Sequence, residues 1–199
     1  MKEILLATRN KDKVEEISEI LAGLAVRIRT LSEFPDLPEV VEDGKSFEEN
    51  AKKKAVAVAR ETGLLSLADD SGLVVPALGG EPGIFSSRFA GEDATYEKNW
   101  KLLLSKMENV PDENRMAYFV CVAVLGEGEK AVAVAEGRCQ GKILRGPKGN
   151  GGFGYDPVFL YPPAGLTFAE LPGEEKNRVS HRAAAMRKIR DILEDRLRG

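Results

Sequence analysis

The pattern of apolar and polar positions at the start of the chain predicts a strand, a polar turn and a helix. Residues 2–8 form a short, mostly apolar run that is typical of a buried strand. α/β proteins often bind anions where such a strand leads into a helix, because the free N–H groups of the helix start face the turn. After the turn, apolar side chains recur at helical spacing, at Val14, Ile17, Ile20, Leu21 and Leu24.

The turn itself has the composition of an anion-binding helix start. It reads Thr8-Arg9-Asn10-Lys11-Asp12-Lys13, in which Thr8 and Asn10 can cap the helix and Lys13 adds a positive charge one turn in. We therefore expect it to hold a phosphate. An ordinary helix cap with solvated lysines would have the same residues, and the sequence leaves that alternative open.

A second strand at 25–30 and a proline-rich loop at 34–44 precede a helix with clear end signals. Ser46 and Glu49 fit a capping box that begins this helix, and Gly63 ends it. The pattern predicts a helix up to about residue 62.

Charged residues of this loop and helix are candidates for a site. The loop has an acidic tip at Glu42 and Asp43, either of which could be a metal ligand or simply solvated. Asn50 and Lys54 are four positions apart on the helix and share a face. Lysine runs are most often solvated, but one member of this run could reach a phosphate.

Two adjacent carboxylates follow the next apolar run. Residues 64–67 predict a strand buried on both faces, which we expect to end in Asp69-Asp70-Ser71-Gly72. Side chains alternate along an extended backbone, so Asp69 and Asp70 should point to opposite sides and have different roles. One would lie mainly on a metal ion and the other nearer the water or substrate. A strand end with a solvated turn is the alternative.

The later part of the chain predicts antiparallel strands added to this start, and therefore a mixed sheet. Residues 95–107 form an amphipathic helix whose Trp100 is expected to pack in the core. The runs 115–125 and 130–138 are joined by a glycine-containing turn that indicates a hairpin. Before them, Arg88 has a guanidinium suited to phosphate, although it could equally be a surface arginine.

A glycine-rich loop at 145–157 presents two aromatic rings and a carboxylate, and leads into a predicted strand at 157–160. Its glycines match a dinucleotide-binding pattern, but no helix follows, so that interpretation fails. Phe153 and Tyr155 would suit stacking on a base, with Asp156 beside them. Two core aromatics that anchor a surface turn are the alternative.

The C-terminal segment predicts a helix with Ser180 as its N-cap and His181 at its start. His181 is the only histidine of the sequence, and no cysteine lies near it. A histidine-rich metal site is therefore excluded, which leaves ligand recognition or a structural role. The helix is indicated by apolar Met186, Ile189, Leu193 and Leu197.

Composition narrows the class of protein. The 199 residues, 43% hydrophobic and 31% charged, fit one soluble globular domain over 1–199. No run is apolar enough to cross a membrane and no signal peptide is recognisable, so we expect a cytoplasmic protein. A net charge of −3 argues against binding a polynucleotide. Cys121 and Cys139 lack metal-ligand spacing and are expected to be buried, inert thiols.

The charged candidates together indicate a nucleotide site. Glu42, Asp69 and Asp70 would form an all-oxygen site that suits Mg²⁺ or Mn²⁺ rather than zinc. With a platform for a base, this set suggests a nucleoside triphosphate and a carboxylate that activates water. The candidate cations exceed the needs of one phosphate, and they are Lys13, Lys54, Arg88, Lys176 and Arg182.

Six blocks in order cover the chain from end to end: Thr8-x-Asn10-x-x-Lys13, Glu49-Asn50-Ala51-x-x-Lys54-Ala55, Ala68-Asp69-Asp70-Ser71-Gly72-Leu73, Ser86-x-Arg88-x-x-Gly91, Gly151-Gly152-Phe153-Gly154-Tyr155-Asp156-Pro157 and Glu175-Lys176-x-x-x-Ser180-His181-Arg182. Together they resemble the non-canonical purine nucleoside triphosphate pyrophosphatases, the inosine triphosphate pyrophosphatase family. The resemblance implies an α/β fold with a central mixed β-sheet flanked by helices, and two lobes with the active site in the cleft between them. It also implies hydrolysis of ITP, dITP and XTP to the monophosphate and pyrophosphate by a Mg²⁺-dependent homodimer, with Mn²⁺ as a substitute, which clears deaminated purines from the nucleotide pool.

The resemblance also assigns roles. The Thr8–Lys13 turn, Lys54 and Arg88 would hold the triphosphate, with Glu42 and Asp69 or Asp70 on the metal. Asp70 would accept the proton of the attacking water, and Ser71 would contact substrate. Donors from His181 or Arg182 would suit O6 of a 6-oxo purine. The base and sugar pocket would be lined by Phe153, Gly154, Tyr155, Asp156, Lys176, His181 and Arg182.

One position departs from the family pattern. Arg9 stands where the family often has glycine, and it either narrows the phosphate turn or points outward. Two other functions stay open. A related pyrophosphatase for modified pyrimidine or methylated nucleotides would share the triphosphate chemistry. A non-catalytic nucleotide sensor would bind without turnover, although the Asp69-Asp70 pair argues against it.

Overall fold

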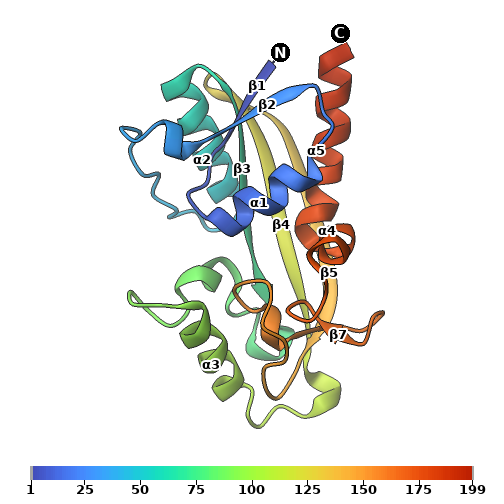
Figure 1. The fold of residues 1–199 in the computed structure, drawn as a ribbon. Coiled ribbons are helices and arrows are strands. Elements are labelled where there is room, and N and C mark those ends of the chain that lie inside the picture. The colour runs from blue at the N-terminus through green and yellow to red at the C-terminus, as the bar shows by residue number, and fades with distance from the viewer. Residues whose placement is uncertain (1, 199) are drawn as a thin grey trace. The chain divides into compact units, whose positions relative to one another are not determined.

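The computed structural model describes residues 2–198 and contains a seven-stranded sheet in the order β2-β1-β3-β4-β5-β6-β7, flanked by helices (Figure 1). This confirms the predicted fold class. The strands are β1 (Lys2–Leu6), β2 (Val26–Thr30), β3 (Leu65–Val74), β4 (Met116–Glu127), β5 (Lys130–Ile143), β6 (Phe159–Tyr161) and β7 (Leu166–Thr167). The helices are α1 (Lys11–Ile20), α2 (Phe47–Thr62), α3 (Tyr96–Lys106), α4 (Gly173–Val179) and α5 (His181–Arg198).

The sheet is mixed, as the order of predicted elements indicates. β1 is parallel to both of its neighbours, with Ile4 opposite Ile28 of β2 and Leu65 of β3. At the other end of the sheet, β6 is antiparallel to β5 and to β7. β1, α1 and β2 therefore form a parallel strand–helix–strand motif, with the elements in the order that the first thirty or so residues predict.

Contacts divide the chain into two compact units. The first comprises the chain up to Asp70, the segment Cys121–Gly137 and the chain from Arg182 onward. The second comprises Ser71–Val120 and Arg138–His181. Two expectations from the sequence stay predictions: that residues 1–199 form one domain, and that the active site lies in a cleft between two lobes. No helix within residues 2–198 is long and apolar enough to cross a membrane.

Alternation along β3 decides which helix each of its residues faces in the first unit. Leu67 packs in an apolar cluster with Ile17 of α1 and Ile189 of α5. Ala68 packs in a different cluster, with Ala51 of α2. Because successive side chains point to opposite faces, the residue after Ala68 faces α1 and α5 and the next one faces α2.

The second unit has an apolar cluster of its own. Phe119, Phe159 and Phe168 are buried in it together with Leu103 of α3. Trp100 packs against this cluster, which confirms its predicted place in the core.

α2 begins and ends where its signals predict. Ser46 is the N-cap, since its hydroxyl accepts a hydrogen bond from the N–H of Glu49 at 3.1 Å. Gly63 ends the helix with a positive φ of 69°, a conformation that glycine adopts without strain. The carboxylate of Glu49 accepts from the N–H of Lys45 rather than that of Ser46, so the predicted capping box is only half formed.

Two predicted boundaries are wrong. β3 does not end at the Asp69-Asp70 pair but continues to Val74, because both faces of the strand stay covered through this stretch. The strand predicted at 157–160 starts only at Phe159, after a 3-10 turn over Asp156–Val158. The C-terminal helix α5 begins at His181, directly after the extended residue Ser180, as predicted, and the short helix α4 before it was not predicted.

Candidate active site

The turn between β1 and α1 is a capped helix start, as predicted. Asn10 is the N-cap of α1, and its Oδ1 accepts from the N–H of Lys13 at 3.2 Å. The Thr8 hydroxyl accepts from the N–H of Asn10 at 3.2 Å. These bonds fix the turn in the shape that presents the first N–H groups of the ten-residue helix to an anion.

Arg9 points away from this turn, which was one of the two outcomes left open. It is exposed, and its Nη2 donates to the carbonyl of Leu37 at 2.9 Å. The bulk of Arg9 therefore does not narrow the turn. Lys11 is exposed, and Asp12 lies in the first turn of α1.

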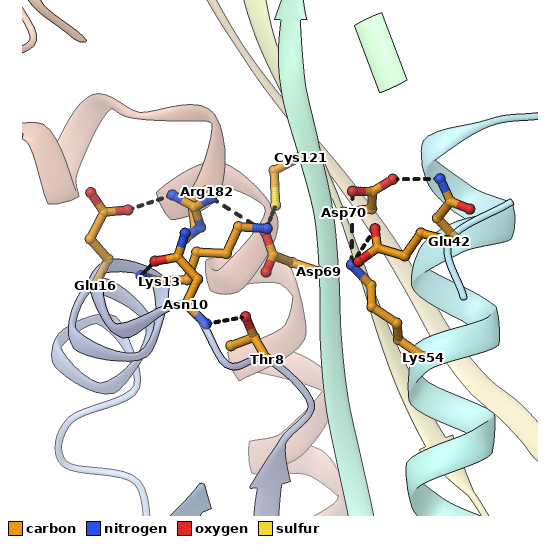
Figure 2. A network of polar contacts seen from close by, with 11 residues as sticks. Thr8, Asn10, Lys13, Glu16, Glu42, Lys54, Asp69, Asp70, Cys121 and Arg182 are labelled. Atoms are coloured by element: carbon orange, nitrogen blue, oxygen red, sulfur yellow. Dashed lines mark hydrogen bonds and ion pairs between the residues drawn. The ribbon is translucent and has the colours of Figure 1, made fainter. Parts of the chain in front are cut away.

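Asp69 lies in a buried ionic network on the face of β3 that meets α1 and α5 (Figure 2). The Asp69 carboxylate is fully buried, 3.1 Å from Lys13 Nζ and 3.3 Å from Arg182 Nη2. Arg182 Nη1 also contacts the carboxylate of Glu16 at 2.5 Å. The Cys121 thiol lies 3.8 Å from Asp69 Oδ2. The network therefore joins α1, β3, β4 and α5.

The charges in this network hold one another ionised. Burial by itself would raise the pKa of Asp69, but the charges of Lys13 and Arg182 outweigh it and hold that pKa well below its usual range. Burial would likewise lower the pKa of Arg182, and the carboxylates of Asp69 and Glu16 raise it instead. Asp69 and Arg182 are therefore both charged.

Asp70 points to the opposite face, toward α2 (Figure 2). Its Oδ2 accepts from the Asn50 amide at 3.1 Å, and its Oδ1 lies 3.8 Å from Lys54 Nζ. Lys54 Nζ is also 3.1 Å from the carboxylate of Glu42. Burial, aided by the charge of Glu42, raises the pKa of Asp70 above its ordinary value although Lys54 opposes this. The prediction that the two aspartates face opposite sides is confirmed.

The three acids predicted as metal ligands do not gather in one place. Among the described residues 2–198, no group of three or more Asp, Glu, His or Cys side chains is arranged to hold a metal. The reason is that Lys13 and Arg182 pair with Asp69 on its own face of β3. Glu42 and Asp70 share the other face.

The Glu42 and Asp70 pair nevertheless suits a divalent cation. Both carboxylates converge on the ammonium of Lys54, so a positive charge already occupies the space between them. Glu42 is on a loop and is 36% exposed at its side chain, so it can adjust its position. Carboxylate oxygens are the protein donors that Mg²⁺ prefers.

In the second unit, Asp156 and Lys176 form a buried ion pair beside Phe153. Lys176 Nζ lies 2.5 Å from the Asp156 carboxylate, and both side chains are about 95% buried. The same ammonium lies 4.6 Å from the centre of the Phe153 ring. Asp156 also accepts from the N–H of Phe153 at 2.9 Å, so the pair fixes the glycine-rich loop.

Of the two interpretations left open for the aromatic rings of this loop, Tyr155 follows the second and is a core residue. Tyr155 is buried in the apolar cluster of the second unit, and its hydroxyl donates to the carbonyl of Ser86 at 2.8 Å. The ring has no open face for a base. Phe153 is only partly buried, so stacking of its ring on a base stays a prediction. Gly154, between the two aromatic residues, adopts a φ of +63°, which glycine permits.

The remaining predicted residues lie at several places in the second unit. His181 is buried and stacks on Phe119, with ring centres 4.6 Å apart and planes 12° from parallel. Ser71 is partly buried in β3, directly after Asp70. Arg88 is exposed, and its guanidinium lies over the ring of Phe85 at 5.1 Å.

Two residues that the sequence reasoning did not assign to the site belong to it. Asn50 bonds Asp70, and Glu16 bonds Arg182. Asn50 lies one turn before Lys54 on the same helix face, and Glu16 lies one turn after Lys13, so helical spacing from a predicted residue was the available signal.

Comparison with known proteins gives this arrangement a family. Residues 4–192 match the sequence model of the Ham1 family. The chain belongs to the Ham1 family. A "dITP/XTP pyrophosphatase" of Geobacter sulfurreducens is 52% identical over 97% of both chains, and one of Desulforamulus reducens is 50% identical over 96% of this chain and 94% of its own. The solved Ham1 protein of Coxiella burnetii is 42% identical and superposes with a TM-score of 0.90, over 98% of this chain and all of its own. These Ham1 relatives confirm the predicted family and the mixed-sheet fold.

Proposed function

We propose that this Ham1 protein hydrolyses deaminated purine nucleoside triphosphates, ITP, dITP and XTP, to the nucleoside monophosphate and pyrophosphate. The observation that carries this function is the separation of Asp69 and Asp70 on β3. One carboxylate is neutralised by buried cations, and the other faces Lys54 and Glu42 beside α2. Relatives that match nearly the whole chain bear the name of this activity, which supports the proposal.

The first unit supplies groups for the triphosphate. The capped Thr8–Lys13 turn would receive phosphate oxygens on the N–H groups of α1, and Lys54 would add a charge from α2. From the family resemblance, Arg88 would add a bidentate donor. Glu42 and Asp70 would hold Mg²⁺, or Mn²⁺ in its place, and the ion would neutralise charge on the triphosphate. Asp69 would act by holding Lys13 and Arg182 rather than as a metal ligand.

Asp70 is the group we assign to proton transfer. Water would attack the α-phosphorus, the bond from that phosphorus to the bridging oxygen would break, and pyrophosphate would leave with that oxygen. The proton lost by the water would pass to the carboxylate of Asp70. Ser71, the next residue of β3, would contact the substrate.

Selectivity for a 6-oxo purine would come from donors at the base. His181 and Arg182 would donate to O6, while Lys176 with Asp156 would fix the loop on which Phe153 stacks against the base. Gly154 and Tyr155 would line the pocket with their backbone. Adenine presents a donor at the same position, so the site's donors would be left unpaired by ATP.

The assembly and location follow from the same proposal. We expect a homodimer, and size-exclusion chromatography with light scattering would show twice the mass of the 21.7 kDa chain. We expect a cytoplasmic enzyme, since the nucleotide pool is its substrate source, and a tagged chain followed by cell fractionation tests this. We expect no membrane or polynucleotide partner.

A steady-state assay with ITP, XTP, ATP and GTP in Mg²⁺ tests the proposed activity. We expect pyrophosphate and monophosphate from ITP and XTP, with ATP and GTP nearly inert. Guanine also carries O6, so inert GTP would require the site to exclude the 2-amino group as well. Preferred turnover of a modified pyrimidine or methylated nucleotide would instead support the related pyrophosphatase. Tight binding of ITP without turnover would support a nucleotide sensor.

A further inference from the structure

The last residues of the loop before α2 form ion pairs and hydrogen bonds with side chains of that helix. Four successive loop positions each contact a side chain of α2, two through ion pairs and two through backbone N–H groups. The acid at position 42 is one of them, so these contacts place a carboxylate of the candidate metal site. From position 42 to 45 the pairs are Glu42–Lys54, Asp43–Lys53, Gly44–Asn50 and Lys45–Glu49.

Asn50 differs from the other helix residues of this set because it also reaches β3. Its Oδ1 accepts from the N–H of Gly44 at 2.8 Å, and its Nδ2 donates to Asp70 Oδ2 at 3.1 Å. The side chain is buried, with 1% of the residue exposed. The N–H of Gly44 can only donate, so it requires the amide oxygen and leaves the NH₂ group for Asp70. The orientation of the amide is therefore determined.

Gly44 leaves room for this arrangement. A Cβ added there would lie 2.5 Å from Asn50 Oδ1 and 2.9 Å from the Cβ of Glu49. The backbone at position 44 can approach the amide closely only without a side chain. The loop and the amide are thus matched in shape as well as in hydrogen bonding.

A carboxylate needs such a partner to keep one orientation. The last torsion of an aspartate side chain has a broad energy profile, so packing alone orients the group poorly. With Oδ2 held by Asn50, Asp70 Oδ1 is directed toward Lys54, which also contacts Glu42.

We propose that Asn50 is a positioning residue for the reaction. It holds the Asp70 carboxylate in the orientation that accepts the proton of the attacking water, and it ties this orientation to the loop that carries Glu42. The inference rests on the proposed function, in which Asp70 is the proton acceptor.

Asn50→Asp separates the two hydrogen bonds of the amide. The new carboxylate can still accept from the N–H of Gly44, but it lacks the NH₂ group that orients Asp70. We expect kcat for XTP to fall roughly 10-fold to 100-fold, with KM within about twofold of wild type, because the acceptor is misplaced while the triphosphate contacts remain. Asn50→Ala removes both bonds without adding a charge, and it should lower kcat at least as much.

Ser66→Ala is the matched control. Ser66 is buried in β3 and its hydroxyl donates to the carbonyl of Ala55 in α2 at 2.5 Å, so it links the same two elements without touching Asp70. We expect a lower melting temperature with kcat and KM close to wild type. This separates a general loss of α2–β3 packing from a loss of orientation.

A stability cycle tests the contact without turnover or metal. Melting temperatures of the metal-free protein are compared for Asn50→Asp, Asp70→Asn and the double variant. In the double variant the amide at position 70 can donate to the carboxylate at position 50, so the bond is restored in reverse. We expect the double variant to melt above the temperature that the two single shifts add up to.

The outcomes distinguish this inference from the proposed function. Wild-type kcat in Asn50→Asp or Asn50→Ala would overturn the positioning role, as would additive melting shifts. A rise in KM that matches the fall in kcat would assign Asn50 to substrate binding instead, and would also overturn it. If the wild-type protein fails to hydrolyse XTP, the proposed function is wrong and the role of Asn50 in it falls too, whatever the stability cycle shows.

Discussion

Asp69 and Asp70 are identical side chains on neighbouring residues, and β3 gives them different chemistry. Asp69 lies between Lys13 and Arg182 and is fully buried, so it stays ionised in a closed network. Asp70 accepts a hydrogen bond from the Asn50 amide and lies 3.8 Å from Lys54 Nζ, and burial raises its pKa. The first arrangement stabilises a charge, whereas the second leaves a carboxylate able to take a proton.

Asp70→Asn tests the role of the second carboxylate. An amide has the same size but cannot accept the proton, so we expect kcat to fall about 10²-fold to 10⁴-fold. The fold should survive, because the replacement is neutral and the site is already costly for a charge. Pyrophosphate release measures turnover, and circular dichroism measures whether the variant is folded. Near-normal turnover in a folded variant would show that Asp70 is not the acceptor.

Asp69→Asn tests the buried network. It leaves Arg182 and Lys13 without their shared counter-charge in a water-excluded place, so unfolding free energy should fall by about 3–5 kcal/mol. Urea unfolding followed by tryptophan fluorescence measures this. Asp43→Asn, which removes an exposed pair with Lys53, is the control and should unfold close to wild type. Equal effects of both substitutions would contradict the structural role of Asp69.

At the scale of elements, α2 shows what a sequence makes predictable. Its ends at Ser46 and Gly63 depend on local hydrogen bonds and on a glycine conformation, and both were predicted. The continuation of β3 past Asp70 was not, because it depends on segments far away in the sequence that cover both faces of the strand. Local sequence signals thus predict where helices and strands lie. Which residues surround a charged residue of a strand can be determined only from the folded structure.

Gly44→Ala tests how α2 and its preceding loop act together. The new methyl group would contact Asn50 Oδ1 and must displace the amide or the loop. We expect a lower kcat for XTP even though residue 44 is assigned no contact with substrate. Gly173→Ala is a control for glycine replacement with no atom within 4 Å of the added Cβ and no positive φ, and its kcat should be unchanged. Wild-type kcat in Gly44→Ala would show that the loop absorbs the methyl group.

At the scale of the whole chain, the pattern of apolar positions predicted most of the strands and helices, but not β7 or α4. The six motif blocks predicted the family. Roles of single aromatic residues were less predictable. Phe153 and Tyr155 are two positions apart in one loop, yet Tyr155 is buried with its hydroxyl bonded to Ser86. A glycine-rich loop has no regular period, so the sequence alone does not show which ring enters the core.

The two cysteines report on each compact unit separately. Cys121 is in the first unit and Cys139 in the second, and both are buried. Burial raises the pKa of Cys139 to about 11 and also raises that of Cys121, so little reactive thiolate is present at mildly alkaline pH. Iodoacetamide followed by peptide mass spectrometry should find both thiols unmodified in the native protein and modified in guanidinium chloride. Rapid native labelling of one thiol would mean that its unit opens locally.

The most direct test of the proposed activity is turnover of XTP in ¹⁸O-labelled water, with ATP in parallel. Attack on the α-phosphorus predicts that the label enters xanthosine monophosphate, that pyrophosphate is unlabelled, and that ATP is nearly inert. Label in pyrophosphate, release of orthophosphate, or equal turnover of ATP would contradict the assignment of the cleaved bond or of the base pocket.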